Sequence, residues 1–265
     1  MAHLVLQQPD PRVEARFADA LSGAHTVTLA RTWADLRRIV GRPDVDGCVV
    51  DADSPSRHEA FLEIRRLRKK HPDLALVAYA DVSESDPELV RLGSLGVDGV
   101  VLARRPPWAS GIRRAVEGAL AVAGARWVGR SLRGRCPDAA AEAVAWAVEH
   151  ASDGPPVARV AAALGHTPRS LAALLRGAGL PTPVRVLLWG RLLQAAALLG
   201  RDQRTVEDTA LCLGYATASS FGRAMKSETG FAPREVAARG GLRFVQSRLF
   251  PERPRRLPDA ARPRT

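Results

Sequence analysis

Long apolar runs are missing from this sequence of 265 residues. No stretch approaches the roughly 18 consecutive apolar residues that a membrane-spanning helix needs, and no signal peptide opens the chain. Hydrophobic residues still make up 46% of the sequence, which is ordinary for a chain that buries a core. We therefore expect a cytoplasmic protein with one large domain or two and no contact with a membrane.

Cysteine is also scarce, with Cys48, Cys136 and Cys212 scattered along the chain. An odd number of widely separated cysteines suits neither a disulfide framework nor a zinc site, and the six histidines show no metal-ligand spacing. We expect buried thiols in a reducing compartment, with no metal and no cofactor.

Lysine is as rare as cysteine, since 36 of the 39 basic residues are arginine. Residues 1–125 hold 17 basic and 17 acidic side chains, so their charges cancel. Residues 126–265 hold the remaining 22 basic and 11 acidic side chains, which gives 22 − 11 = +11 and accounts for the whole net charge. A basic half joined to a neutral half predicts a polyanion-binding domain linked to a domain with another task.

The first half alternates between short apolar segments and segments with helical spacing. The apolar segments are short enough for buried strands and lie at 3–6, 25–30, 47–51, 74–80 and 99–103. The helical segments lie at 11–21, 33–40, 56–70, 86–95 and 109–123. This alternation predicts a three-layer α/β domain of the (βα)5 type, with a parallel sheet covered on both faces. Its reactive edge is expected at the carboxyl ends of the strands, marked by Gln7, Gln8, Asp51, Tyr79 and Ala103.

The stretch VVDADSP (49–55) ends a strand in an aspartate with a proline four residues later. Together with GVDGVVLARRPP (96–107), it resembles the flavodoxin-like receiver domain of response regulators over about residues 1–123. That resemblance makes Asp51 the phosphoacceptor position. A receiver that accepts phosphate also needs acidic residues after its first strand to hold Mg²⁺.

This chain departs from the receiver pattern where the phosphorylation chemistry would occur. It has Gln7 and Gln8 at the acidic positions, Tyr79 at the expected hydroxyl-bearing position and Ala103 at the expected lysine. We therefore expect Asp51 to be a degenerate phosphoacceptor in a pseudo-receiver that dimerises or contacts a partner. Two alternatives stay open: control by phosphorylation of Asp51, and a ligand sensor that uses this crevice.

Three further segments are interpreted from composition. The basic run at 65–70 is expected to be a solvated helix end. Residues 124–137, GARWVGRSLRGRCP, are rich in glycine and arginine and are predicted to be a linker between the receiver-like domain (1–123) and the next domain. Residues 241–265 are predicted to be a basic, proline-rich and disordered tail.

The second half contains one unit written twice. The sequence of residues 159–183 aligns with that of residues 207–233, so that Leu164–Gly165–His166 matches Leu213–Gly214–Tyr215. Each copy reads as an apolar helix, a glycine turn and a second helix, which is typical of a helix-turn-helix whose second helix enters the major groove of DNA. The apolar segment 184–199 is predicted to be a helix that joins the copies. A helical hairpin used only for packing is the alternative to DNA binding.

The second copy, GYATASSFGRAMKSETGFAPREV, resembles the C-terminal signature of AraC/XylS-type transcription regulators. The resemblance covers about residues 138–240 and implies an all-α domain with two helix-turn-helix units that read two successive major-groove segments. By position, it implies base-reading candidates at Arg169, Ser170, Ala172, Ala173, Ser219, Ser220 and Arg223. Phosphate contacts are expected at Thr167, Arg176, Thr217 and Lys226, and core positions at Leu171, Leu175, Trp189, Phe221 and Met225.

The sequence therefore predicts a bacterial transcription regulator with a receiver-like domain and a double helix-turn-helix. Double-stranded DNA is the expected partner. RNA polymerase and a second copy of the chain, through the N-terminal domain, are further candidates. We expect no enzyme, because the sequence shows no nucleophile–base pair, metal cluster or glycine-rich phosphate loop.

Overall fold

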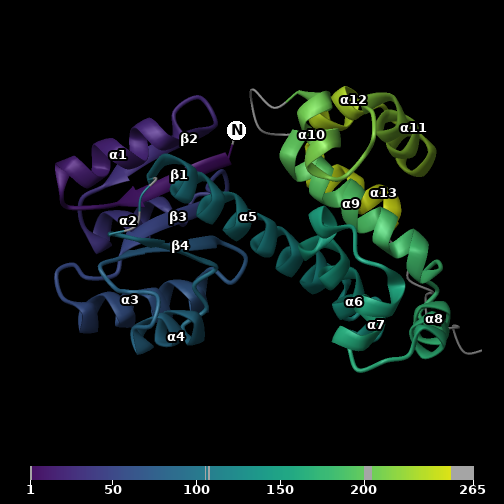
Figure 1. The fold of residues 1–265 in the computed structure, drawn as a ribbon, viewed down its shortest axis with the longest axis horizontal. Coiled ribbons are helices and arrows are strands. Elements are labelled where there is room, and N and C mark those ends of the chain that lie inside the picture. The colour runs from purple at the N-terminus through teal and green to yellow at the C-terminus, as the bar shows by residue number, and fades with distance from the viewer. Residues whose placement is uncertain (1, 105, 107, 200–204, 252–265) are drawn as a thin grey trace, which may run out of the picture.

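The N-terminal half is a five-stranded parallel sheet between two layers of helices (Figure 1). The computed structural model describes residues 2–104, 106, 108–199 and 205–251. The elements of this half are β1 (Ala2–Gln7), α1 (Pro11–Leu21), β2 (His25–Ala30), α2 (Trp33–Ile39), β3 (Gly47–Asp51), α3 (Arg57–Lys70), β4 (Ala75–Ala80), α4 (Pro87–Ser94), β5 (Gly99–Leu102) and α5 (Trp108–Leu132).

The strand order β2-β1-β3-β4-β5 is that of the flavodoxin-like doubly wound fold, as expected from the alternating pattern. One face of the sheet packs on α1 and α5 through side chains such as Phe17 and Ile112. The other face packs on α2, α3 and α4, through side chains such as Leu36, Ile64 and Leu92. Because helices cover both faces, every residue of β3 is buried, which explains why this strand is continuously apolar up to Asp51.

The C-terminal half consists of helices around one core. Its elements are α6 (Asp138–Glu149), η1 (Ala151–Asp153), α7 (Val157–Ala163), α8 (Pro168–Gly177), α9 (Pro183–Leu199), α10 (Val206–Cys212), α11 (Ala218–Thr229), α12 (Pro233–Ala238) and α13 (Gly241–Leu249). Helix α9 crosses the centre of this half, where Leu192 and Leu193 are fully buried. No helix within the described ranges is both long and apolar enough to cross a bilayer.

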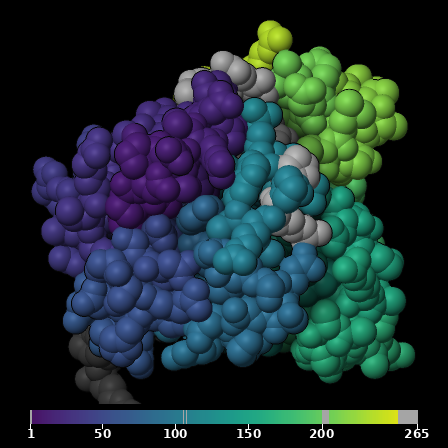
Figure 2. Space-filling model, turned by 60° about the vertical axis from the view of Figure 1, so that its left-hand side comes forward, coloured from purple at the N-terminus to yellow at the C-terminus, as the bar shows by residue number. Residues whose placement is uncertain are grey.

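The predicted linker at 124–137 is wrong over most of its length, because α5 continues to Leu132. Residues up to Ala123 bury their apolar side chains in the core of the sheet domain. The next turns bury Ala125, Val128 and Leu132 in the C-terminal core, at helical spacing. One helix therefore belongs to both cores, and Figure 2 shows the two halves meeting along it.

The predicted disordered tail is also wrong at its start. Residues Gly241–Leu249 form α13, which buries Val245, Gln246 and Leu249 against the C-terminal core. Val245 and Leu249 recur at helical spacing, but two arginines and one glycine in the same segment hid the helix in a reading by composition. The rest of the predicted tail, 252–265, lies outside the described residues.

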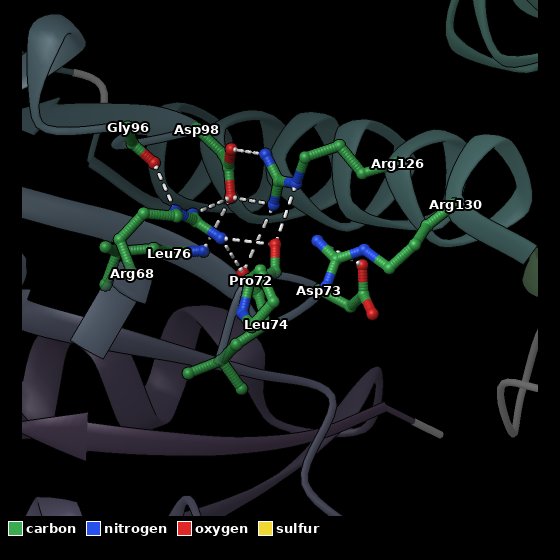
Figure 3. A network of polar contacts seen from close by, with 9 residues as sticks. All are labelled: Arg68, Pro72, Asp73, Leu74, Leu76, Gly96, Asp98, Arg126 and Arg130. Atoms are coloured by element: carbon green, nitrogen blue, oxygen red, sulfur yellow. Dashed lines mark hydrogen bonds and ion pairs between the residues drawn. The ribbon is translucent and has the colours of Figure 1, made fainter. Parts of the chain in front are cut away.

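The basic run at 65–70 is not wholly solvated, because Arg68 points into the fold (Figure 3). Its guanidinium donates to the carbonyl oxygens of Gly96, Pro72 and Leu74 and pairs with the carboxylate of Asp98, at 2.8 Å. The side chain of Asp98 is only 3% exposed, so its charge needs partners. A long-range pair of this kind leaves no local pattern in the sequence.

Arg126 of α5 reaches the same carboxylate from the opposite side (Figure 3). It pairs with both oxygens of Asp98 and also donates to the carbonyls of Pro72 and Leu74. One turn further along α5, Arg130 pairs with Asp73 at 3.3 Å. These contacts fasten the second half of α5 to the amino-terminal edge of β4. Helix α5 is therefore held to the sheet domain by charge as well as by packing.

Candidate nucleic-acid interface

The first helix-turn-helix consists of α7 and α8. Gly165 ends the first helix with a φ of +69°, a conformation that a side chain would strain. Thr167 then caps α8: its hydroxyl oxygen accepts from the N–H of Ser170, and the Ser170 hydroxyl accepts from the N–H of Thr167. Leu171 and Leu175 are buried, as expected, and fix the face of α8 that packs inward.

The second helix-turn-helix, α10 and α11, repeats this construction. Gly214 has a φ of +72°, and the Thr217 hydroxyl accepts from the N–H of Ser220 at 3.0 Å. Phe221 and Met225 are fully buried, in agreement with their prediction as core. The matched glycine, threonine cap and buried pair show that the sequence repeat encodes one local geometry twice.

The outward faces of α8 and α11 carry most of the predicted DNA-contacting residues. Exposed side chains are those of Thr167, Arg169, Ser170, Ala173, Arg176, Thr217, Ser219, Arg223 and Lys226, while Ala172 and Ser220 are half-buried. The hydroxyl groups of Ser170 and Ser220 already form hydrogen bonds at the starts of their helices. The Ser170 hydroxyl accepts from the N–H of Thr167, and the Ser220 hydroxyl donates to the Thr217 carbonyl at 2.8 Å. Their contribution is therefore first to the shape of the two helices.

The four cationic side chains on these faces lack protein partners. Arg169, Arg176, Arg223 and Lys226 form no hydrogen bond or ion pair with any described residue. In the sheet domain, by contrast, many arginines pair with carboxylates, as Arg37 does with Glu63 at 2.6 Å. An exposed cation without an internal partner is available to a phosphate or a base edge.

One contact that the sequence did not suggest sets the position of α11. Trp189 of α9 was predicted to be core but is only half-buried, and its indole N–H donates to Glu228 of α11 at 2.6 Å. Arg185 of α9 pairs with the same carboxylate at 3.0 Å. The indole N–H of a tryptophan that packs against a core needs a hydrogen-bond partner, so the tryptophan itself was the sequence signal that such a contact exists. The partner itself could not be named from sequence.

The carboxyl-end crevice of the sheet was the second predicted site. Asp51 and Tyr79 are register neighbours on β3 and β4, and Gln7 and Gln8 are both buried. The backbone N–H of Asp51 donates to the Gln7 side chain at 3.1 Å, and that of Asp10 donates to the Gln8 side chain at 2.9 Å. The amides that replace the expected carboxylates are thus part of the packing of the crevice.

The remaining charges of the crevice neutralise one another. Asp53 pairs with Arg57 and accepts from the N–H of Asp81, while Arg104 pairs with Asp81 rather than reaching toward Asp51. Burial raises the pKa of Asp51 above its ordinary value of 3.8. Among the described residues, no group of three or more side chains is arranged to hold a metal ion.

Comparison with known proteins identifies the helical region. Residues 160–239 match the family described as "Helix-turn-helix domain". This region is an AraC-type helix-turn-helix domain. The match covers 80 of the 265 residues and runs from within α7 to the end of α12. No curated protein matches the chain.

Several solved structures are similar to the chain. An orphan response regulator of H. pylori is 16% identical, with 45% of this chain and 96% of that chain covered and a TM-score of 0.39. RcsB from Salmonella enterica serovar Typhimurium, bound to a promoter, is 13% identical, with 70% and 97% covered and a TM-score of 0.38. The transcriptional regulator CdpR from Pseudomonas aeruginosa is 22% identical, with 68% and 62% covered and a TM-score of 0.34.

Proposed function

We propose that this chain is a cytoplasmic transcription regulator of bacteria and that it reads two successive major-groove segments on one face of DNA, one with α8 and one with α11. The observation that carries the proposal is the repeated geometry, in which each second helix exposes cations that no described residue pairs. The major groove returns to the same face of B-DNA after one helical turn of about 34 Å. Two such units joined by α9 suit that repeat.

The two helices are expected to contribute differently to sequence reading. Helix α11 offers Ser219 and Arg223, one turn apart, and arginine can form two hydrogen bonds with guanine. Helix α8 offers Ala172 and Ala173 at its central positions, which can contact thymine methyl groups but form no side-chain hydrogen bonds. Arg169 is then the polar reader of the first unit. We infer that α11 carries more of the specificity.

In vitro selection from a random duplex pool, followed by methylation interference on the selected site, tests the proposal. We expect two blocks of interfering guanines on one face, with centres about 10 base pairs apart. A single block would mean that only one unit enters the groove. No enrichment above the starting pool would refute sequence-specific binding.

Arg223→Ala separates base reading from phosphate contact, with Lys226→Ala as the matched control. Loss of a bidentate guanine contact should weaken binding to the selected site by about 1–3 kcal/mol, and binding to random DNA much less. Lys226→Ala should weaken both equally and reduce the salt dependence. Equal losses on both DNAs for Arg223→Ala would assign Arg223 to phosphate.

The receiver-like half is proposed to act without phosphorylation. Neutral Gln7 and Gln8 supply no carboxylate for Mg²⁺, and the Arg57–Asp53 pair and the Arg104–Asp81 pair already satisfy the neighbouring charges. Treatment with acetyl phosphate and Mg²⁺, followed by intact mass measurement, should show no phosphoryl adduct. An adduct that disappears in Asp51→Asn would establish the phosphorylation-controlled alternative.

Partners other than DNA complete the proposal. A second copy of the chain is expected to bind through the receiver-like half, and RNA polymerase is expected to bind the protein when it is on DNA. Sedimentation velocity of the full chain tests the first expectation, because a dimer should persist when DNA is absent. A monomer at every concentration measured would refute it.

A further inference from the structure

Helices α8 and α11, the two reading helices, are attached to the helical half in different ways. Helix α8 is held by apolar contacts, with Leu171 and Leu175 in the common core. Among the described residues, its side-chain hydrogen bonds stay within 166–170, and no side chain of α9 takes part in them. Helix α11 buries a matching apolar pair but also forms polar contacts with two other helices. Figure 1 shows both reading helices on the side that faces away from the sheet domain.

Glu228, in the last turn of α11, is the centre of these polar contacts. Its carboxylate accepts from the indole N–H of Trp189 at 2.6 Å and pairs with Arg185 at 3.0 Å. Both partners lie in the first two turns of α9, and only residues 178–182 separate this part of α9 from α8. The start of α9, which follows directly from the first helix-turn-helix, therefore binds the reading helix of the second.

Helix α13 holds the same end of α11. Nε of Arg248 donates to the carbonyl oxygen of Thr229 at 3.2 Å. Phe250, just after α13, packs edge to face on the ring of Trp189, with the ring centroids 5.1 Å apart. The carboxyl end of α11 is thus fixed by α9 and α13, whereas Arg223 in the middle of α11 is exposed.

The contact at Glu228 restricts the geometry of α11 more than apolar packing does. The Glu228 side chain is only 10% exposed, so its carboxylate is largely withdrawn from water and needs both of its donors. Apolar contacts have no preferred direction, and they tolerate small sliding of one helix over another. A withdrawn charge between two directed donors resists such sliding, because a displacement that lengthens either contact leaves the carboxylate short of a partner.

We propose that Glu228 is a positioning residue that fixes α11 relative to α8 and thereby sets the spacing between the two DNA segments that the chain reads. The inference rests on the proposed function, because spacing matters only when both reading helices enter the groove. It adds that the chain selects DNA sites by the distance between the segments as well as by their bases. One inserted base pair moves the second segment about 3.4 Å along the duplex and turns it about 35° around the axis, which a rigid pair of helices cannot follow.

Competition binding of the full chain to two duplexes tests the proposal. One duplex is the selected site, and the other carries one extra base pair between the two blocks of interfering guanines. The parent chain should bind the extended site about tenfold more weakly or worse, whereas Glu228→Ala should reduce this ratio of affinities to about threefold or less. Glu228→Gln keeps an oxygen for Trp189 but loses the charge that pairs with Arg185, so its ratio should lie between these two.

Two further variants separate positioning from charge and from packing. Glu207→Gln removes one exposed negative charge from α10, which matches the charge change of Glu228→Gln. It should leave the ratio at the parent value, even where it changes the affinity for both duplexes. Trp189→Phe keeps an aromatic ring beside Phe250 but removes the N–H donor, and it should lower the ratio as Glu228→Gln does. Circular dichroism of each variant must match that of the parent, and if Glu228→Ala does not fold, the other variants decide.

Nuclear magnetic resonance reports on the contact in the absence of DNA. The indole N–H resonance of Trp189 is assigned from its absence in Trp189→Phe. It should move upfield in Glu228→Gln, because a neutral acceptor forms a weaker hydrogen bond than a carboxylate, and it should stay in place in Glu207→Gln.

The proposal is overturned if a folded Glu228→Ala keeps the parent ratio, because Glu228 then contributes to stability alone and the proposed function is untouched. It is also overturned if Glu207→Gln lowers the ratio as much as Glu228→Gln, or if the indole resonance does not move in Glu228→Gln. A parent chain that binds both duplexes equally would instead refute the reading of two segments, and the spacing role with it.

Discussion

Replacing Asp98 with asparagine should destabilise the chain more than any other single charge removal in the contact between α5 and the sheet domain. The carboxylate is almost fully buried, pairs with Arg68 and Arg126 and accepts from the N–H of Leu76 at 2.9 Å. Asparagine keeps an oxygen for Leu76. It loses the negative charge, however, and turns an NH₂ group toward two guanidinium donors.

The expected loss is about 2–3 kcal/mol of the free energy of unfolding. Breaking a buried ion pair by removing one partner typically costs about 3–5 kcal/mol. The cost is lower here because the Arg126 side chain is 30% exposed and both arginines keep carbonyl acceptors. Arg130→Met is the matched control, since its pair with Asp73 is 45% and 33% exposed and should contribute about 0–1 kcal/mol.

Urea unfolding of each variant, followed by circular dichroism and by hydrogen exchange of β4, measures the difference. The double variant Asp98→Asn, Arg126→Met should be less unstable than the sum of the two single changes, because the second change removes a cation already left without its partner. Additive losses would show that the two side chains do not act together. An Asp98→Asn loss no larger than that of Arg130→Met would refute the argument from burial.

Three further outcomes are expected. Gly190→Ala should cost 2 kcal/mol or more, roughly, because its Cβ would overlap the α6 backbone, whereas Gly118→Ala in α5 meets open space and should stabilise by up to about 1 kcal/mol in urea unfolding. Asp51→Asn should stabilise the fold at pH 7: the raised pKa of Asp51 means that its buried charge opposes folding above about pH 3.8, so the advantage should vanish below that pH. Cys212 is exposed and should react with a thiol reagent in the folded protein, whereas Cys48 is buried with its pKa raised to about 12 and should react only after unfolding.

The parts of the fold that follow from local pattern could be predicted from the sequence. Each strand of the sheet lies within two residues of its expected range, since buried parallel strands read as short apolar runs. The helix starts also depend on local sequence. The side chains of four N-cap residues each accept a hydrogen bond from a backbone N–H in the first turn of the helix that follows, namely Asp10, Thr32, Ser56 and Asp86. The two helix-turn-helix units were visible because the sequence repeats them.

The parts that depend on distant partners could not be predicted. Arginine at position 126 looks like a linker residue until Asp98 is placed beside it, and Arg68 looks solvated for the same reason. The expectation that all three cysteines are buried fails at Cys212, whose exposure is set by how α10 packs.

The continuity of α5 changes where a signal can act on the DNA-binding half. A modification at Asp51 would occur at the carboxyl ends of the strands, where the ring of its register neighbour Tyr79 contacts Trp108 in the first turn of α5. An event at the amino-terminal edge meets Asp98, Arg126 and the segment 70–74 directly, at the turns of α5 that also enter the C-terminal core. Coupling requires an element that both sites bias, and α5 at this edge is such an element. The two edges of the sheet therefore meet α5 at different turns, and the amino-terminal edge meets it at the turns whose side chains also enter the C-terminal core.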